Sequence, residues 1–300
     1  MSKPLLPYNL AKGFPNVLFL GNGINYNDKF SWNNVINKTA ENEENTSLLK
    51  HSGSFQVPNT ILSFALCSDD DTKRHSTYLD AFKEYDHEPN EQLNKLLDIP
   101  FNAILTTNYT YEIECHYKSN YAAITDDSKS RYALKTADDP KYLIHTYNRF
   151  QNSPPIWHVH GELRRKRSMI LSHDEYARLI GEIVSHNKQL GNGIEKYYHS
   201  FKAKSWVDYF IVGNVFFLGY SLDFSELDIW WLLGRKLRER APVGNVFFYE
   251  PASEQNRYKH EVLKMKGFNV ETLDYKINDD YKPFNEFYYA AINDIKSKIE

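Results

Sequence analysis

The sequence predicts an α/β protein built on a Rossmann-like, doubly wound, mostly parallel sheet with an inserted helical lobe. Two features of the 300-residue chain lead to this prediction. Short, continuous apolar runs are typical of strands buried on both faces, and long helical patterns separate these runs. Strands that alternate with helices form parallel sheets whose two faces are both covered by helices.

Seven apolar runs are the predicted strands. They cover residues 17–20, 103–106, 156–159, 169–171, 215–218 and 246–249, with a weaker run at 270–273. The helical patterns that separate or follow them lie at residues 174–185, 226–240, 254–266 and 283–299. This alternation is the order expected for crossover connections between parallel strands.

The middle of the chain departs from the alternation. Residues 28–100 contain helical patterns at 60–66, 77–85 and 91–97 but no convincing strand, and residues 120–153 are polar. We interpret both as insertions that form a helical lobe or lid, with a further helical excursion at 182–210. Because no repeat or long linker interrupts the chain, we predict a single domain over residues 1–300, with helical insertions at about 28–100 and 182–210.

Composition excludes several classes of protein. Hydrophobic residues make up 41% of the chain, enough for a packed core, and the net charge of -3 gives no general attraction to nucleic acid or anionic membrane. No apolar run is as long as a membrane span, and the N-terminus lacks the apolar core of a signal peptide. Cys67 and Cys115 are far apart, which excludes a disulfide framework and a four-cysteine zinc site. We therefore expect a cytoplasmic protein with no membrane partner and no direct nucleic-acid binding.

Small and polar residues follow four of the predicted strands. The segments are GNGIN at 21–25, TTNYT at 106–110, HVHGE at 158–162 and GYSL at 219–222. Ligands of open parallel sheets bind beyond the carboxyl ends of the strands, so this coincidence predicts a ligand site. The first segment lacks the third glycine of the dinucleotide fingerprint, whose place Tyr26 holds, and an ordinary tight turn is its alternative.

Other segments also have alternative interpretations. Asn108 could be the N-cap of a helix that begins near Tyr109. His158 and His160 lie two apart on a predicted strand and should point to the same side, either as a metal pair or as one hydrogen-bonded and one active histidine. We expect no metal, because no third ligand stands at a telling spacing from them.

Three further features are expected to be structural. The acidic group of Asp223, Glu226 and Asp228 most simply starts the helix that follows it, because acidic residues favour helix N-termini. The tryptophans and leucines of residues 230–233 are favoured as core because aromatic side chains bury large areas. The basic run at 164–167 is interpreted as a solvated hairpin turn between two strands.

Taken in order, the four strand-end segments resemble the sirtuin-like NAD-consuming family in its prokaryotic stand-alone form. The matching pieces are GNGIN at 21–25, TTNYT at 106–110, HVHGE at 158–162 and GYSLDFSELDIWWLL at 219–233. Members of that family show a glycine-rich first turn, a Thr-x-Asn motif, a His-Gly motif and a Gly-x-Ser motif before a late helix. The resemblance spans residues 17 to about 250.

The chain also departs from the family pattern. The protein-deacylating sirtuins carry a module with four zinc-binding cysteines, which two cysteines cannot build. The first turn reads Gly-Asn-Gly in place of Gly-Ala-Gly, and Thr110 stands where an acidic residue is usual. Without the zinc module, the chain is similar to the NAD hydrolases of bacterial antiviral defence.

The resemblance implies NAD as the substrate, no metal, and Asn108 and His160 as catalytic residues. An asparagine amide can bind a ribose hydroxyl or a water without titrating, and a histidine can act as general base. The NAD-binding residues that the resemblance implies are Gly21, Asn22, Gly23, Asn25, Thr107, Gly219, Ser221 and Glu250. Glu250 has the alternative of a plain, solvated carboxylate at a strand end.

The implied function is hydrolysis of NAD+ to nicotinamide and ADP-ribose, by a regulated effector of bacterial antiviral defence that acts through NAD depletion. Because an unregulated NAD hydrolase would drain its own cell, we expect a homo-oligomer that is activated by a separate sensor or ATPase protein. Two alternatives stay open. One is NAD-dependent protein deacylation or ADP-ribosyl transfer, and the other is a non-catalytic assembly module that binds NAD or ADP-ribose.

Overall fold

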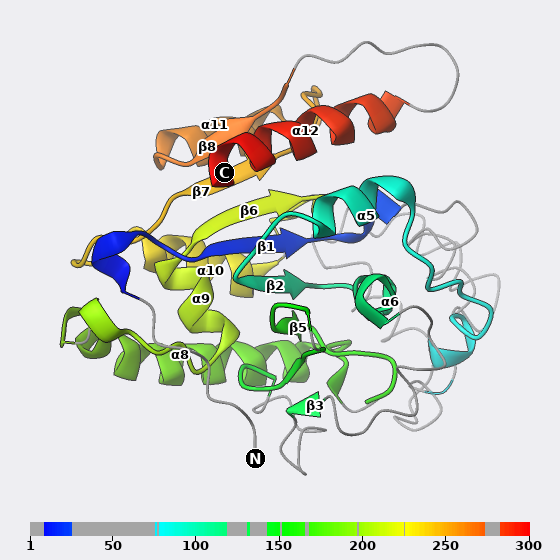
Figure 1. Cartoon of the computed structure of the whole chain (residues 1–300). Coiled ribbons are helices and arrows are strands. Elements are labelled where there is room, and N and C mark those ends of the chain that lie inside the picture. Colours follow the sequence, from blue (N-terminus) through cyan, green and yellow to red (C-terminus); the bar gives the residue numbers. More distant parts are fainter. Residues whose placement is uncertain are drawn as a thin grey trace.

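The computed structural model describes residues 9–25, 76, 78–118, 131–132, 143–150, 152–165, 168–196, 198–224, 226–273 and 283–300. Its centre is an eight-stranded sheet with the strand order β3-β4-β5-β2-β1-β6-β7-β8 (Figure 1). The strands are β1 (Asn16–Leu20), β2 (Ala103–Thr106), β3 (Arg131–Tyr132), β4 (Tyr147–Asn148), β5 (Ile156–His158), β6 (Asn214–Leu218), β7 (Val246–Tyr249) and β8 (Asn269–Glu271). The six strands from β5 to β8 are parallel, and β3 and β4 add an antiparallel edge.

The chain winds outward from β1 in both directions, as a doubly wound sheet does. It passes first through β2 to β5, then returns to the other side of β1 and continues through β6 and β7 to β8. The last residue of β1, Leu20, is in register with Thr106 of β2 and with Leu218 of β6. The predicted α/β class with a mostly parallel sheet is confirmed, and the strand order reverses between β1 and β6, where such sheets bind ligands.

Helices cover both faces of the sheet and bury alternate residues of each strand. The helices are α5 (Glu91–Leu97), α6 (Glu112–Lys118), α8 (His173–Lys196), α9 (Trp206–Val212), α10 (Leu227–Lys236), α11 (Arg257–Met265) and α12 (Pro283–Ile299), with short 3-10 helices η1 (Leu10–Lys12), η2 (Asn22–Asn25) and η7 (Tyr198–Ser200). Val17 and Phe19 pack in one core with α8, α9 and α10. Leu18 and Leu20 pack in the other core with α5, α6 and α12. Adjacent strand residues point to opposite faces, so continuous apolar runs can supply both cores.

Six of the seven predicted strands form, and one does not. Residues 169–171 are buried but lie outside the sheet, because their backbone groups bind elsewhere. The Ile170 N–H donates to the His160 carbonyl at 2.9 Å, and the Ile170 carbonyl accepts the Tyr109 hydroxyl at 3.0 Å. The Leu171 N–H donates to the Glu175 carboxylate at 2.7 Å, which fixes this segment at the start of α8.

The helix predictions differ most in their ends. Helices α5 and α12 match the predicted bounds, whereas α8 continues to Lys196 and so passes the predicted end at residue 185. Leu232 and Leu233 of α10 are buried, and Trp230 and Trp231 pack against the same core, as predicted. The pattern predicted at 60–66 and most of the lobe predicted at 28–100 lie outside the described residues, and the single-domain assignment stays a prediction. None of the described helices is both long and apolar enough to cross a membrane.

Two glycine turns meet backbone to backbone where the strand order reverses. The Gly23 N–H donates to the Gly219 carbonyl at 2.8 Å, and the Gly21 N–H donates to the Leu218 carbonyl at 3.0 Å. A Cβ atom on Gly21 would lie 2.3 Å from the Gly219 oxygen. Gly219 itself has a φ of 66°, a conformation that glycine adopts without strain. The glycines of the first turn are therefore needed for contact with the end of β6.

A buried lysine ties α10 to the end of α9. Lys236, in the last turn of α10, donates from Nζ to the carbonyls of Phe210, Ile211 and Gly213 at 3.1, 2.8 and 2.6 Å. Helix ends leave carbonyls without intrahelical partners, and a lysine ammonium has three donors to give them. Lys236 therefore fixes the position of α10 against α9.

We predict that Gly21→Ala lowers the free energy of unfolding, whereas Gly234→Ala does not. The added methyl group at position 21 overlaps the Gly219 backbone, and overpacking of this kind costs about 1–3 kcal/mol. Gly234, in the middle of α10, has no atom within 4 Å of an added Cβ, so alanine should stabilise its helix by about 0.5–1 kcal/mol. Urea unfolding of the two variants measures the difference in their free energies of unfolding. Equal free energies would contradict the prediction, because they would show that the turns at Gly21 and Gly219 can move apart at little cost.

Candidate functional site

The ends of β2 and β5 bring the two predicted catalytic residues to the same edge of the sheet. Thr106 of β2 and His158 of β5 are paired in register, and the Val159 N–H donates to the Thr106 carbonyl at 2.8 Å. Asn108 and His160 each lie two residues beyond this pair. Parallel strands end at the same edge, so both residues stand at the carboxyl edge where ligands bind.

The backbone of Asn108 is held on both sides, while its side chain is not. Its N–H donates to the Thr106 hydroxyl at 3.1 Å, and that hydroxyl donates to the Leu20 carbonyl at 2.9 Å. Helix α6 begins at Glu112, so the alternative that Asn108 caps a helix beginning near residue 109 is wrong. Among the described residues, the Asn108 side-chain amide has no hydrogen-bond partner. This amide is therefore available to a ligand.

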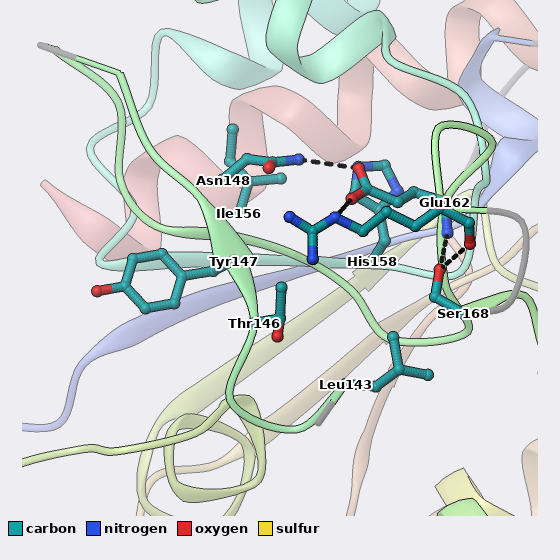
Figure 2. A pocket seen from close by; sticks show the side chains of 9 residues that line it. Leu143, Thr146, Tyr147, Asn148, Ile156, His158, Glu162 and Ser168 are labelled. Atoms are coloured by element: carbon teal, nitrogen blue, oxygen red, sulfur yellow. Dashed lines mark hydrogen bonds and ion pairs between the residues drawn. The ribbon is translucent and has the colours of Figure 1, made fainter. Parts of the chain in front are cut away.

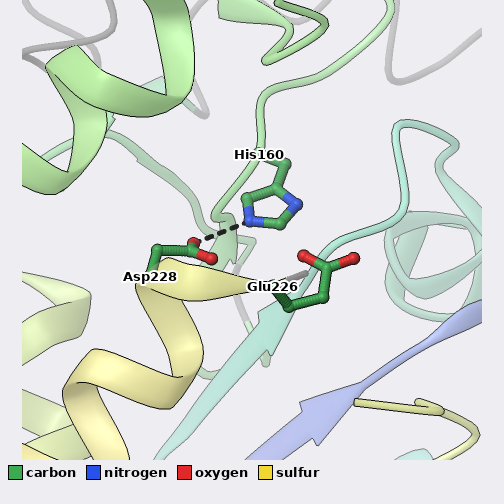
Figure 3. Close-up of side chains that lie close together, drawn as sticks. All are labelled: His160, Glu226 and Asp228. Carbon is green, nitrogen blue, oxygen red and sulfur yellow. Dashed lines mark hydrogen bonds and ion pairs between the residues drawn. The ribbon is translucent and has the colours of Figure 1, made fainter. Parts of the chain in front are cut away.

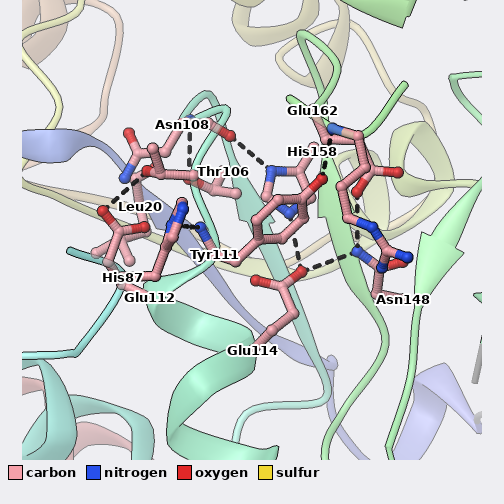
Figure 4. Close-up of polar contacts among 12 residues, drawn as sticks. Leu20, His87, Thr106, Asn108, Tyr111, Glu112, Glu114, Asn148, His158 and Glu162 are labelled. Atoms are coloured by element: carbon pink, nitrogen blue, oxygen red, sulfur yellow. Dashed lines mark hydrogen bonds and ion pairs between the residues drawn. The ribbon is translucent and has the colours of Figure 1, made fainter. Parts of the chain in front are cut away.

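His158 is a cation that joins Asn108 to helix α6. Its Nδ1 lies 2.6 Å from the Asn108 carbonyl oxygen, and its Nε2 lies 2.8 Å from Oε1 of Glu114 (Figure 4). A carbonyl and a carboxylate only accept hydrogen bonds, so both ring nitrogens donate and the ring is an imidazolium. Burial alone would lower the pKa of His158, but the Glu114 carboxylate raises it to about 9.

Two buried glutamates of α6 lie beside Thr110 and His158, and burial raises the pKa of one of them, Glu112. Glu114 accepts from His158 and also from the Asn148 amide at 2.9 Å. Glu112 accepts from the Thr110 hydroxyl at 2.8 Å and from the Tyr85 hydroxyl. Burial alone would raise the pKa of Glu114, but the charge of His158 and their hydrogen bond hold it below its ordinary value. The acidic support of this site is therefore shifted along the chain from position 110.

His160 forms a pair with Asp228 at the start of α10. Its Nε2 lies 2.8 Å from Oδ2 of Asp228, and the two side chains are 5% and 0% exposed (Figure 3). Burial alone would lower the pKa of His160, but the Asp228 carboxylate raises it above its ordinary value. Among the described residues, Nδ1 has no hydrogen-bond partner, and it points away from Asp228.

The expectation that His158 and His160 point to the same side is wrong. Strand β5 ends at His158, and a turn over residues 159–160 redirects the chain. His158 therefore contacts Glu114 of α6 on one face of the sheet, whereas His160 contacts Asp228 of α10 on the other. Gly161 permits this turn with a φ of 93°, and a Cβ there would lie 2.2 Å from the Ser168 carbonyl oxygen.

Glu226 lies beside the His160–Asp228 pair. It accepts a hydrogen bond from the Tyr176 hydroxyl at 3.3 Å and caps α10 without a side-chain hydrogen bond to that helix. Burial raises its pKa, the neighbouring His160 opposes that rise, and Asp228 adds to it. The acidic group that was expected only to start the helix therefore faces His160.

The first glycine turn has internal partners at most of the positions assigned to NAD. The backbone N–H groups of Gly21 and Gly23 both bind carbonyls at the end of β6, as described above. Oδ1 of Asn25 accepts from the Asn90 N–H at 3.2 Å, which joins this turn to the N-terminus of α5. Asn22 and Thr107 are half-buried. A phosphate-binding role for this turn stays a prediction, and the structure gives Gly21, Gly23 and Asn25 structural roles of their own.

The residues assigned to NAD at the ends of β6 and β7 contact each other through α11. Lys259 donates from Nζ to the Ser221 carbonyl and to Oε1 of Glu250, the latter at 2.8 Å. His260 binds the other oxygen of Glu250 at 2.7 Å. Glu250 is therefore ion-paired and not the plain solvated carboxylate of the alternative. Contact of Ser221 or Glu250 with a ribose stays a prediction.

With this geometry in view, the comparison with known protein families is decisive. Residues 102–271 match the family model described as SIR2-like domain, which is more than half of the chain. The protein belongs to the SIR2-like family. A comparison with curated proteins found no match.

The SIR2-like match includes the second, third and fourth strand-end segments together with Glu114, His158 and Asp228. The first glycine turn precedes it, and that turn is attached through the sheet pairing of β1 with β2 and β6. Membership in the family implies an NAD-related activity. Family membership does not specify the reaction or the residues that catalyse it.

A small pocket lies on the β4 side of the SIR2-like site. Its cavity volume is about 10 Å³, and its lining includes Asn148, His158, Glu162, Arg165 and Ser168 (Figure 2). Arg165 donates from Nε to Glu162 at 3.1 Å, so at this position the basic run predicted as a solvated turn faces inward. None of the residues assigned to NAD lines this pocket.

Glu114 and Asp228 were not singled out as site residues by the sequence, whereas the alternative of a hydrogen-bonded histidine is confirmed for His158. Glu114 and Asp228 hold the two histidines, and His158 holds the backbone of Asn108. A weak signal was present, because acidic residues at buried helical positions need partners. Asp228 lies 68 residues from His160 and Glu114 lies 44 from His158, so spacing alone could not join them.

We predict that the stability of the protein falls as the pH rises from about 6.5 through about 9, and that His158→Gln weakens this dependence. The pKa of His158 is 6.5 ordinarily and about 9 when folded. Its stabilising contribution is therefore complete below 6.5 and lost above 9. At about 1.4 kcal/mol per pKa unit, the contribution is roughly 3 kcal/mol.

Urea unfolding at several pH values measures this dependence. Part of the pH dependence of stability should remain in His158→Gln, because the pKa of His160 is also raised in the folded protein. The exposed His199 provides the matched control, because His199→Gln should leave the slope as in the wild type. An unchanged slope in His158→Gln would contradict the cationic bridge.

Proposed function

We propose that the protein is an NAD+ glycohydrolase that cleaves the nicotinamide–ribose bond to give nicotinamide and ADP-ribose. The observation that carries the proposal is a pair of free polar groups at one strand edge. Among the described residues, the Asn108 amide and His160 Nδ1 have no hydrogen-bond partner. Several neighbouring polar groups are paired, among them the Thr106 hydroxyl, both ring nitrogens of His158 and Nε2 of His160. Two unpaired groups in such a site are available to bind and activate a substrate.

The chemistry of NAD suits these two groups. The nicotinamide is already cationic, so it leaves with the electron pair of its bond to the ribose and needs no general acid. The ribose then develops oxocarbenium character, as in other glycosyl transfers. Asn108 holds a ribose hydroxyl or the attacking water through its amide. His160 takes a proton from that water at Nδ1, while Asp228 accepts Nε2–H and thereby fixes the tautomer.

The remaining assignments belong to the same proposal. NAD contacts Asn22, Thr107, Ser221 and Glu250 and the glycine turns at 21–23 and 219, with no metal cofactor in the reaction. Asn108 and His160 are only 7% and 4% exposed, so a dinucleotide needs an opening to reach them. This burial supports regulated access to the site. We propose that the protein is an effector of antiviral defence in the cytoplasm and that the site is opened by homo-oligomerisation or by a separate sensor or ATPase protein. We also propose that residues 1–300 form a single domain with helical insertions.

We predict that Asn108→Ala and His160→Ala remove most NAD turnover while leaving the fold intact. The loss expected for His160→Ala is about 10²–10⁴-fold, the usual contribution of a general base. The measurement is mass spectrometry of NAD incubated with each protein, with and without the product of a neighbouring gene, and His199→Ala is the matched control.

Each product identifies one function. ADP-ribose and nicotinamide support hydrolysis, whereas an acylated ADP-ribose formed from an acyl-lysine peptide would establish deacylation. ADP-ribose attached to protein would establish transfer. NAD binding without product under every condition would leave the non-catalytic module as the function. Equal turnover by wild type and His160→Ala would remove the role proposed for His160.

We predict that Asp228→Asn moves the acid limb of the turnover profile to lower pH and lowers the maximum rate. The base form of His160 is the active one, and the Asp228 carboxylate raises the pKa of that group. Removing the negative charge lowers the pKa, so the base form persists at lower pH. The rate falls because the amide no longer favours the correct tautomer. Turnover measured from pH 5 to 9 in metal-free buffer tests this, and an unshifted limb would show that Asp228 does not act on His160.

A further inference from the structure

Three side chains from two parts of the chain meet beside the N-terminus of α10. The hydrolysis of NAD does not require all three of them. His160, Glu226 and Asp228 each present one ligand atom, and these atoms all lie within 4.8 Å of one another (Figure 3). Two of the three are buried and Glu226 is half-buried. The set combines one imidazole with two carboxylates, which are ligand types of divalent transition metals.

The cluster has an unsatisfied acceptor. Asp228 is fully buried, and its Oδ1 has no hydrogen-bond partner in the part of the chain that the structure describes. A buried carboxylate oxygen without a partner costs free energy, because it has lost its water and gained nothing in return. His160 contacts Oδ2 of Asp228, so Oδ1 of the same carboxylate has neither a hydrogen-bond donor nor a cation beside it among the described residues.

The charges of these three side chains also indicate that a positive group is missing from the cluster. The two carboxylates carry two negative charges when ionised, and a protonated His160 balances one of them. A divalent cation bound by a neutral imidazole and both carboxylates would balance both. Charged side chains can be buried away from water when they are paired with an opposite charge or bind a metal ion.

We propose that His160, Glu226 and Asp228 form a binding site for a divalent transition cation, of which Zn²⁺ is the best match. The cation binds Nε2 of His160 and one oxygen from each carboxylate, with a fourth position open. Zn²⁺ accepts three such protein ligands in tetrahedral geometry, whereas Mg²⁺ and Ca²⁺ prefer oxygen ligands in larger number. The half-buried Glu226 marks the side from which the cation enters.

The cation and the catalytic proton compete for the same atoms. Binding requires that the proton between His160 Nε2 and Asp228 leave Nε2, to solvent from the imidazolium or to Nδ1 from the neutral ring. In the metal-bound neutral imidazole, Nδ1 carries the ring proton and cannot accept a proton from water. Zn²⁺ therefore inhibits NAD turnover reversibly. This consequence rests on the proposed function, whereas the binding of the cation does not.

The sequence did not indicate this site, because Asp228 lies 68 residues from His160 and no third ligand stands at a telling spacing from the two histidines in the sequence. The structure separates these two histidines and supplies both other ligands from the beginning of α10. A metal site of the kind first considered, with His158 and His160 as a pair, is therefore replaced by one that uses His160 alone.

The test is titration of chelator-treated, full-length protein with Zn²⁺ by calorimetry and with Co²⁺ by visible absorption. We expect one cation per chain in the wild type and a 10–100-fold or greater loss of affinity in Glu226→Gln and in Asp228→Asn. Glu254→Gln is the matched control, because Glu254 is exposed and pairs only with Arg257 among the described residues, and its affinity should equal that of the wild type. Circular dichroism shows which variants are folded, and Glu226, which is less buried, provides the readout if Asp228→Asn does not fold.

The outcomes separate the two proposals. Saturable 1:1 binding that Glu226→Gln weakens supports the site, even if no NAD turnover is found. Absence of 1:1 binding at millimolar cation, or equal affinity in Glu226→Gln and the wild type, overturns it. If NAD turnover is present, Zn²⁺ should abolish it and EDTA should restore it, and undiminished turnover at saturating Zn²⁺ would overturn the inhibitory role.

Discussion

The ring of His158 is the contact on which the geometry of the site depends. It is the point where the backbone of Asn108 is joined to helix α6 through Glu114, across two hydrogen bonds of 2.6 and 2.8 Å. A neutral ring could donate only one of these bonds, so the charge on His158 is what keeps the loop after β2 in place. The loop then presents Asn108 at the sheet edge, and the turn after β5 places His160 at the same edge, in contact with Asp228 of α10.

Much of the fold could be predicted because buried parallel strands have a local signature. Six apolar runs became strands, and helices α5 and α12 kept their predicted bounds, since hydrophobic periodicity depends on neighbours along the chain. The segment 169–171 has the same apolar signature but no strand beside it, because its backbone binds Tyr109 and Glu175. Whether an apolar run joins a sheet is decided by partners that the run itself does not contain.

The site was harder to predict for the same reason. Asn108 and His160 were proposed because the short segments that contain them follow apolar runs and resemble motifs of the sirtuin-like family, which are local features. Asp228 was assigned to helix initiation, and nothing in its neighbourhood indicated His160, 68 residues away. The glycines of the first turn were predicted to bind NAD, and the structure shows that the group they approach is the backbone at Gly219. A glycine pair indicates tight contact but does not say with what.

The pairing of His160 with Asp228 crosses the sheet from the β2–β5 half to the β6–α10 half. During synthesis, the residues up to the end of β5 leave the ribosome well before α10 does. A nascent chain therefore holds its histidine without an acid partner until α10 has emerged and docked, with Lys236 at its far end binding α9. The protein consequently gains its complete chemical centre only after α10 has docked on the sheet.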